Sequence, residues 1–134
     1  VALDATFRPR RGPPPAELIA LVRDELGLAV LADVATEAEG LAAAEAGADY
    51  VATTLSGYTG DSTPGPEPDI DLVARLAGRL AVPVIAEGRL WTPEQAAAAF
   101  AAGAHAVVVG TAITNPREIA RRFAAACPAG ATGR

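Results

Sequence analysis

The chain has 134 residues, 51% of them hydrophobic, and a formal net charge of −5. This length suits one domain, and a negative charge without a basic cluster argues against nucleic acid or an anionic membrane as a partner. No apolar run approaches the ~20 residues of a membrane-spanning helix. Cys127 is the only cysteine, and no secretory signal precedes the first helix, so we expect a cytoplasmic protein without disulfides.

Five short apolar runs alternate with five helical patterns. In chain order, the predicted strands and helices are Val1–Asp4, Ala16–Leu26, Leu28–Ala32, Glu37–Ala46, Tyr50–Thr53, Ile70–Ala77, Pro83–Ala86, Pro93–Ala102, Ala106–Val109 and Pro116–Ala126. The apolar runs do not alternate strictly with polar residues, which is typical of parallel strands that are buried on both faces.

Residues that start and stop helices support these boundaries. Thr36, Thr92 and Asn115 are predicted to be N-terminal caps, and the last two are followed by proline, which suits the first helical position. Gly47 and Gly103 stand where two helices should end. The segment that ends in Gly47 recurs around Gly103 at an offset of 103 − 47 = 56 residues, which is two strand–helix units.

Strands that alternate with helices indicate a parallel α/β fold, either an open doubly wound sheet or a closed barrel. The glycine-rich dinucleotide-binding motif is absent after the first strand, where the sequence reads Asp-Ala-Thr-Phe-Arg-Pro, so the barrel is favoured. Eight units need ~200–250 residues. We therefore expect residues 1–134 to form a single domain that is the C-terminal five-eighths of a TIM (β/α)8 barrel.

Polar residues follow each of the five predicted strands. The carboxyl ends of parallel strands meet at one mouth of a barrel, where such folds bind ligands. Carboxylates and hydroxyls suit a polyhydroxylated ligand, and the backbone N–H groups at glycine turns suit a phosphate. The candidate ligand-binding residues are Asp4, Thr6, Asp33, Thr54 and Arg89, with Gly88, Gly110 and Thr111 for the phosphate.

Glu87 is the candidate catalytic residue. It follows four residues of buried strand and precedes a glycine, so its carboxyl group should face the barrel mouth with little water. A desolvated carboxyl group is suited to proton transfer near neutral pH. Two neighbouring predictions stay open: Asp33 also suits a helix cap, and Arg89 also suits a salt bridge at the rim. Residues 57–68 are either a lid or a tolerated flexible insertion.

Several motifs resemble those of the N-acetylmannosamine-6-phosphate 2-epimerase family. The most specific are Thr-Thr-Leu-Ser-Gly-Tyr-Thr at 53–59 and Ala-Glu-Gly-Arg at 86–89. Leu-Asp-Ala-Thr at 3–6, Leu-Ala-Asp-Val at 31–34 and Gly-Ala-His-Ala-Val-Val-Val-Gly at 103–110 extend the resemblance over most of the chain.

The resemblance implies a TIM barrel and an isomerase. The family interconverts N-acetylmannosamine 6-phosphate and N-acetylglucosamine 6-phosphate in sialic-acid and amino-sugar catabolism, by removing the C2 proton and returning it on the other face. No redox cofactor and no metal are expected. The resemblance further implies that Glu87 is one acid/base group, that Asp4 and Arg89 contact the sugar, and that Gly88 and Gly110–Thr111 bind the phosphate.

Two departures from the family pattern bear on activity. The family's catalytic lysine lies on an earlier strand, and this chain contains no lysine. Asn115 stands where the family often carries arginine. We therefore expect the chain alone to be inactive and the complete protein to be an epimerase. The expected partner is a small sugar phosphate, and a homo-oligomer remains an option.

Three other functions remain as alternatives. A thiazole-synthase-like enzyme would require a Schiff-base lysine, which is missing here as well. A ribulose-phosphate epimerase would normally bring metal-binding histidines, and His105 is the only histidine. The non-enzymatic alternative is a half-barrel that binds sugar phosphates without catalysis.

Overall fold

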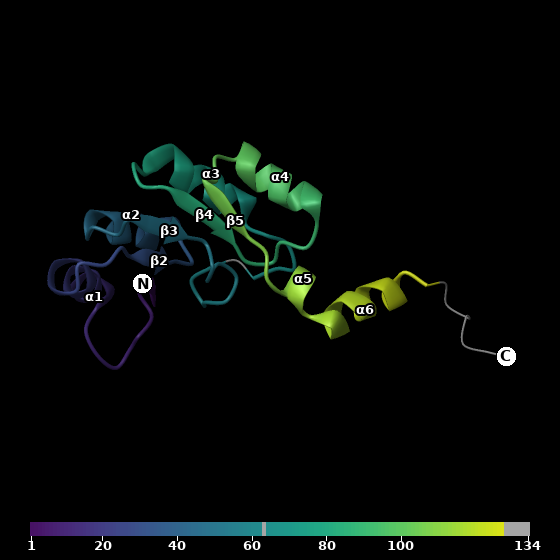
Figure 1. Ribbon diagram of the computed structural model, residues 1–134, viewed down its shortest axis with the longest axis horizontal. Coiled ribbons are helices and arrows are strands. Elements are labelled where there is room, and N and C mark those ends of the chain that lie inside the picture. The colour runs from purple at the N-terminus through teal and green to yellow at the C-terminus, as the bar shows by residue number, and fades with distance from the viewer. Residues whose placement is uncertain (63, 128–134) are drawn as a thin grey trace.

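A computed structural model describes residues 1–62 and 64–127. Its strands form one parallel sheet in the order β1-β2-β3-β4-β5, which is the order of the chain (Figure 1). The strands are β1 Ala2–Asp4, β2 Leu31–Asp33, β3 Tyr50–Ala52, β4 Val84–Glu87 and β5 Ala106–Val108. A doubly wound sheet would reverse its strand order at one point. The uninterrupted order belongs to a barrel wall, so the predicted fold, five strand–helix units of a TIM barrel, is confirmed.

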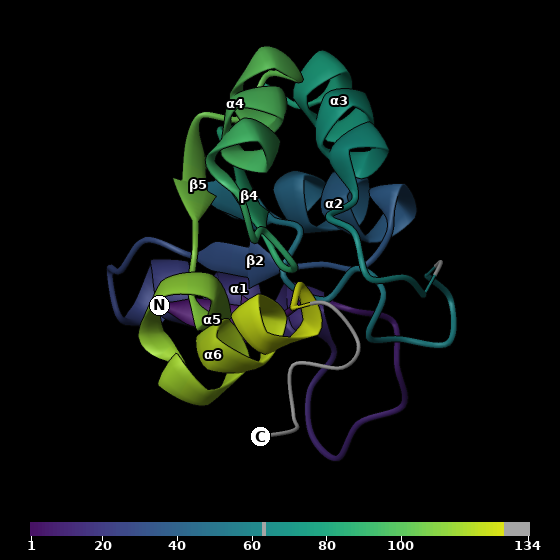
Figure 2. The same ribbon diagram turned by 90° about the vertical axis from the view of Figure 1, so that its right-hand side faces the viewer.

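The helices follow the strands in the predicted alternation. They are α1 Pro15–Ala20, which continues as the π-helical turn η1 Leu21–Glu25, α2 Glu37–Glu45, α3 Ile70–Arg79, α4 Pro93–Ala101, α5 Thr111–Thr114 and α6 Pro116–Ala125. Helices α1 to α4 contact one another in chain order, and α2, α3 and α4 each pack against the strand that follows them. Figure 2 shows α3 and α4 side by side.

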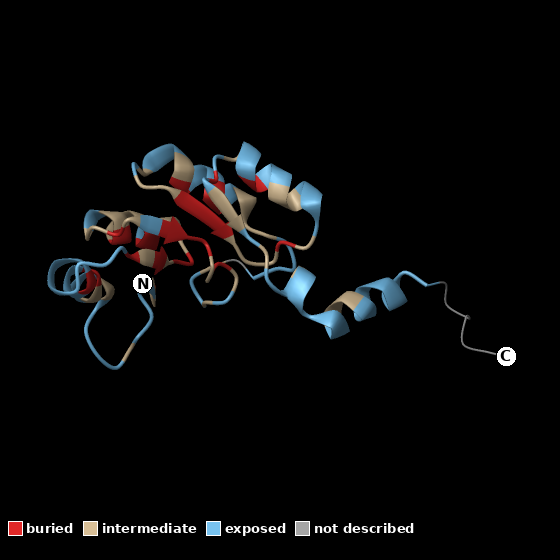
Figure 3. Cartoon of the chain, viewed as in Figure 1, coloured by how far each residue is buried: buried red, intermediate tan, exposed pale blue. Residues whose placement is uncertain are grey.

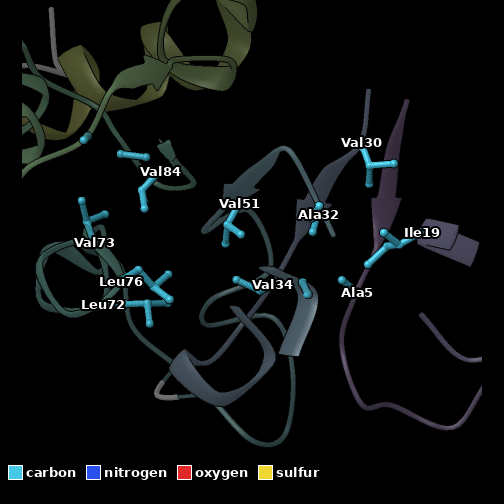
Figure 4. Close-up of a cluster of buried hydrophobic side chains, with 14 of the residues drawn as sticks. Ala5, Ile19, Val30, Ala32, Val34, Val51, Leu72, Val73, Leu76 and Val84 are labelled. Atoms are coloured by element: carbon cyan, nitrogen blue, oxygen red, sulfur yellow. The ribbon is translucent and has the colours of Figure 1, made fainter. Parts of the chain in front are cut away.

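The apolar core lies between the sheet and these helices. Valines on the strands and in the turns around them, including Val51 and Val84, pack with helical residues such as Ile19, Leu72 and Leu76 (Figure 4). Burial is concentrated in the central strands β2, β3 and β4 and in the helix faces turned toward them (Figure 3). This layer of side chains fixes the strands and therefore fixes where their carboxyl ends lie.

The three predicted helix caps are confirmed. The side chains of Thr36, Thr92 and Asn115 accept hydrogen bonds from backbone N–H groups three residues later, at 3.3, 3.2 and 3.2 Å. Gly47 and Gly103 each follow the last turn of a helix with φ +100°, a left-handed conformation that glycine adopts without strain.

The other boundaries agree with the sequence-based expectation to within two residues, and two details differ more. The second strand begins at Leu31 instead of Leu28: the N–H of Leu28 still donates to the Val22 carbonyl of η1 at 3.1 Å, and the N–H of Val30 donates to the Asp49 side chain at 2.8 Å. The short helix α5 was not predicted, since four residues are too few to produce a helical pattern.

Helix α6 extends away from the sheet at the C-terminal end of the described chain (Figure 1). None of its ten residues is buried, and it contacts α5. In the described part of the chain, no helix has the length and apolar character needed to cross a membrane.

Candidate active site

The strand register places the candidate acids at one edge of the sheet. Asp4 pairs with Asp33 across β1 and β2, and Glu87 pairs with Val108 across β4 and β5. Each acid is the last residue of its strand. The backbone register therefore brings the polar strand ends to the same edge of the sheet, as expected.

A pocket of about 260 Å³ opens at this edge. Its lining includes six of the predicted residues, Thr54, Glu87, Gly88, Arg89, Gly110 and Thr111. The remaining lining residues, Tyr58, Leu90, Trp91 and Val108, were not among the predicted site residues. The pocket thus joins the ends of β3, β4 and β5, while Asp4, Thr6 and Asp33 lie beyond its lining.

Glu87 is held at the pocket by the neighbouring strand. The buried hydroxyl of Thr53 accepts a hydrogen bond from the Glu87 N–H at 3.1 Å and donates one to the Glu87 carbonyl at 3.0 Å. Burial raises the pKa of the Glu87 carboxyl, the nearby Thr54 hydroxyl partly offsets the rise, and the charge of Asp33 adds to it. These influences make Glu87 a stronger proton acceptor than an ordinary glutamate.

Asp33 reaches the pocket through Thr54. The Thr54 hydroxyl donates to Asp33 Oδ1 at 2.7 Å, and Thr54 itself lines the pocket. Burial raises the pKa of Asp33, the hydrogen bond from Thr54 lowers it, and the charge of Asp4 raises it further. The alternative role of Asp33 as a helix cap is not seen, because the cap of α2 is Thr36.

Asp4 is bound within its own loop. Its carboxylate accepts from the Thr6 hydroxyl at 2.6 Å and from the Thr6 N–H at 2.9 Å, and it pairs with Arg8 and Arg10. Burial alone would raise the pKa of Asp4, but the hydrogen bonds from Thr6 and Arg8 outweigh that effect and lower it to about 2. Thr6 is fully buried, so it supports Asp4 and does not face the pocket.

Arg89 links the end of β4 to the long segment between β3 and α3. It has a left-handed backbone (φ +59°), directly after Gly88 at φ +107°. Its Nη1 donates to the Gly65 carbonyl at 2.7 Å, and its guanidinium lies 5.9 Å from the ring centre of Tyr58. Its Nε is buried without a hydrogen-bond partner in the described chain. A left-handed backbone at a residue other than glycine, as at Arg89, is strained, and such strain often accompanies a functional site.

The segment 57–68 is closed at its base. The Ser56 hydroxyl donates to Asp69 Oδ2 at 2.7 Å, and Asp69 also caps α3. Gly57 has φ +82°, and a Cβ there would stand 2.3 Å from Arg89 Nη1. Only glycine therefore allows the Arg89 guanidinium to approach this segment so closely.

The predicted phosphate-binding turns lie on two sides of the pocket. Gly88 follows β4, and Gly110 precedes α5, which begins at Thr111. The N–H groups in the first turn of a helix have no partner within that helix and suit an anion. Sequence reasoning missed Tyr58 as a lining residue, although it belongs to the motif at 53–59, and it gave no signal for Leu90 or Val108.

No group of three or more histidine, cysteine, aspartate or glutamate side chains is placed to hold a metal ion within residues 1–62 and 64–127. His105 is exposed and precedes β5, at the opposite end of the strands from the pocket. Trp91 lines the pocket, and the Arg122 guanidinium lies 3.6 Å from its ring centre.

Comparison with known proteins gives a consistent result. The family model described as "Putative N-acetylmannosamine-6-phosphate epimerase" matches residues 1–129. Two relatives, from Caldanaerobacter subterraneus and Cutibacterium acnes, are each named "Putative N-acetylmannosamine-6-phosphate 2-epimerase". They are 48% and 49% identical over 126 residues, which cover 92% of this chain and 53% and 55% of the relatives.

A solved structure shows the same fold. The N-acetylmannosamine-6-phosphate 2-epimerase from Clostridium perfringens is 42% identical, with a TM-score of 0.87 over 92% of this chain and 54% of that one. The chain spans about half the length of the curated relatives it matches. With the family model covering nearly all of its residues, this chain belongs to the N-acetylmannosamine-6-phosphate epimerase family.

Proposed function

We propose that the complete protein interconverts N-acetylmannosamine 6-phosphate and N-acetylglucosamine 6-phosphate by inverting C2. The observation that carries the proposal is Glu87, a half-buried carboxyl group with a raised pKa at a pocket between two glycine turns. Relatives named as N-acetylmannosamine-6-phosphate 2-epimerases, such as those from Clostridium perfringens, Caldanaerobacter subterraneus and Cutibacterium acnes, are 42%, 48% and 49% identical to the chain. A sugar phosphate is the proposed substrate, and a cytoplasmic location and a homo-oligomer remain predictions.

Epimerisation at C2 needs two proton-transfer groups on opposite faces of the sugar. The C2 proton becomes acidic once the ring is open and C1 is a carbonyl, and its removal leaves an enolate. Return of a proton to the other face completes the inversion, without a redox step. Glu87 is proposed as one of these groups. The other is the family's lysine, which this chain does not contain.

The remaining site residues are proposed to bind the substrate. Gly88, Gly110 and Thr111 offer backbone N–H groups around the pocket for the phosphate. Arg89 and Thr54 line the same pocket and are proposed to contact the sugar. Asp33 acts through the Thr54 hydroxyl, and Asp4 with Thr6 completes the acidic edge beside it.

The test uses a complete barrel, made by joining the segment of the C. perfringens enzyme that the chain does not span to this chain. We expect epimerase activity from the fused protein and none from the chain alone. Glu87→Gln in the fused protein should lower kcat by about 10²–10⁴-fold, the range for loss of a general acid or base. Glu94→Gln is the matched control, since Glu94 is exposed on α4.

Two results would contradict the proposal. A fused protein that folds but is inactive would contradict the assigned reaction. Full activity of the Glu87→Gln variant would contradict the catalytic role of Glu87. Turnover by the 134-residue chain alone would show that the missing lysine is not required.

A further inference from the structure

One buried carboxylate has no place in the proposed chemistry. Glu39 lies in the first turn of α2 and is 1% exposed. Burying a carboxylate is costly unless hydrogen bonds replace its water. Oε2 accepts from the N–H groups of Ala35 and Thr36, both at 2.9 Å, and this completes the capping box of α2. Oε1 accepts from the N–H of Phe7 at 2.8 Å, from a loop 32 residues earlier.

The equivalent position on α4 shows what capping alone requires. Gln95 stands 95 − 39 = 56 residues later, at the offset of the internal repeat. Its Oε1 accepts from the N–H groups of Trp91 at 2.7 Å and Thr92 at 3.2 Å, which completes the same capping box. A neutral amide is therefore sufficient for the cap. What the Glu39 carboxylate adds is a second acceptor oxygen, and the group that uses it is the Phe7 N–H.

The two loops joined in this way follow two acids of the site. Phe7 comes directly after Thr6, which donates two hydrogen bonds to Asp4. Ala35 comes two residues after Asp33, which lies opposite Asp4 in the sheet. The Glu39 carboxylate of α2 accepts hydrogen bonds from both loops, and this bridge fixes the segment on which the contacts of Asp4 depend.

We infer that Glu39 is a positioning residue, whose carboxylate holds the loop after β1 against the loop after β2 and so keeps Asp4 in place beside Asp33. Any effect on turnover rests on the proposed epimerase function. The link between the two loops is independent of the proposed function, and it can be measured on the chain alone.

The test is Glu39→Gln, which keeps the shape of the side chain. Its remaining oxygen can serve Ala35 and Thr36 as Gln95 serves α4, but its NH₂ group cannot accept from Phe7. We expect hydrogen exchange at the Phe7 amide to rise about tenfold, as expected for loss of one charge-assisted hydrogen bond. We also expect the pKa of Asp4, now about 2, to move toward its ordinary value as Thr6 loosens. Arg8 and Arg10 still face Asp4, so the change should be partial.

Thr36→Ala is the matched control. It removes the hydroxyl that caps α2 and leaves the Glu39 carboxylate in place. It should lower the melting temperature without changing exchange at Phe7 or the titration of Asp4. The inference is overturned if Glu39→Gln behaves like Thr36→Ala in both readouts. Glu39→Asp is a second variant, which keeps the charge but has a side chain too short to reach both loops. If Glu39→Gln and Glu39→Asp both fail to fold while Thr36→Ala folds, Glu39 has a purely structural role and the inference is overturned.

Turnover supplies an independent readout. In the fused barrel, Glu39→Gln should lower kcat by about ten- to a hundredfold relative to Thr36→Ala, which is the scale of a small misplacement of site residues. Equal kcat values for the two variants would remove the catalytic consequence. An inactive fused barrel that retains Glu39 would instead contradict the proposed function. Hydrogen exchange at the Phe7 amide and the titration of Asp4 would still show whether Glu39 links the two loops.

Discussion

At the scale of single residues, Glu87 shows how the site affects the stability of the fold. Burial raises its pKa in the folded state above the value in the unfolded chain, so folding binds this proton more tightly. The resulting stabilisation is fully present below the unfolded pKa and is lost as pH rises through the folded pKa. Near neutral pH, the ionised carboxyl group therefore weakens the fold.

This sign gives a prediction for Glu87→Gln in the chain alone. The substitution should raise the melting temperature at pH 7, and the gain should disappear near pH 4, where the wild-type carboxyl group is protonated. Glu94→Gln should have the opposite sign, because hydrogen bonds from its own backbone N–H and from Thr92 lower the pKa of Glu94. Thermal unfolding at the two pH values measures both. A lower melting temperature for Glu87→Gln at pH 7 would show that Glu87 is not desolvated.

A second prediction at this scale concerns Gly57. An alanine there would have to keep φ near +82°, and its Cβ would stand 2.3 Å from Arg89 Nη1. We expect Gly57→Ala to cost about 1–2 kcal/mol in the free energy of unfolding, the cost of one left-handed residue. Gly60→Ala should be neutral or slightly stabilising, because Gly60 has no positive φ and open space beside it. Urea unfolding compares the two variants, and equal effects would contradict the left-handed conformation of Gly57.

At the scale of elements, Leu76 packs helix α3 closely against helix α2. Leu76 is fully buried in α3, and its Cδ2 lies 2.4 Å from the place that a Cβ on Gly40 of α2 would occupy. We expect Leu76→Ala to destabilise the chain by about 2–5 kcal/mol. Ile113→Ala, at a side chain that is 70% exposed, should change stability by less than about 0.5 kcal/mol. Urea unfolding again compares them, and similar losses would mean that Leu76 is not part of the core.

The sequence predicted best the features that depend on a few neighbouring residues. The caps at Thr36 and Thr92 are formed within three residues, so their motifs are visible in the chain. The same motif would have identified Glu39 as a capping residue. It contains no sign of the bond to Phe7, because that contact depends on how two strands lie side by side.

In the candidate site, too, the features that follow from the strand–helix pattern were predicted and the contacts between loops were not. The repeat of strands and helices predicted that Glu87 and Gly110 would meet at one edge, because parallel strands carry their carboxyl ends together. It did not predict that Thr6 is buried beneath Asp4, or that Arg89 reaches Gly65. Both arrangements follow from side-chain directions in loops, which have no periodic pattern to reveal them.

At the scale of the whole molecule, the five strands differ in their number of neighbours. Strand β3 pairs with a strand on each side, whereas β1 and β5 each pair on one side within the described chain. Unpaired strand edges expose backbone N–H groups to water. The related C. perfringens structure extends beyond the part that this chain covers, and we predict that further strands lie beside β1 and β5 in a complete barrel.

Hydrogen exchange in the fused barrel tests this arrangement. Amides of β1 and β5 that point outward from the sheet should exchange at least tenfold more slowly in the fused barrel than in the chain alone, because each gains a strand partner. The amides of Val51 in β3 and of Thr53 directly after it already donate to Pro83, just before β4, and to Ile85 in β4, so their exchange should change only with global stability. Equal slowing in β1, β3 and β5 would indicate general stabilisation without edge pairing. Slowing confined to β1 and β5 would show that the added strands complete the wall that carries Asp4 and Gly110.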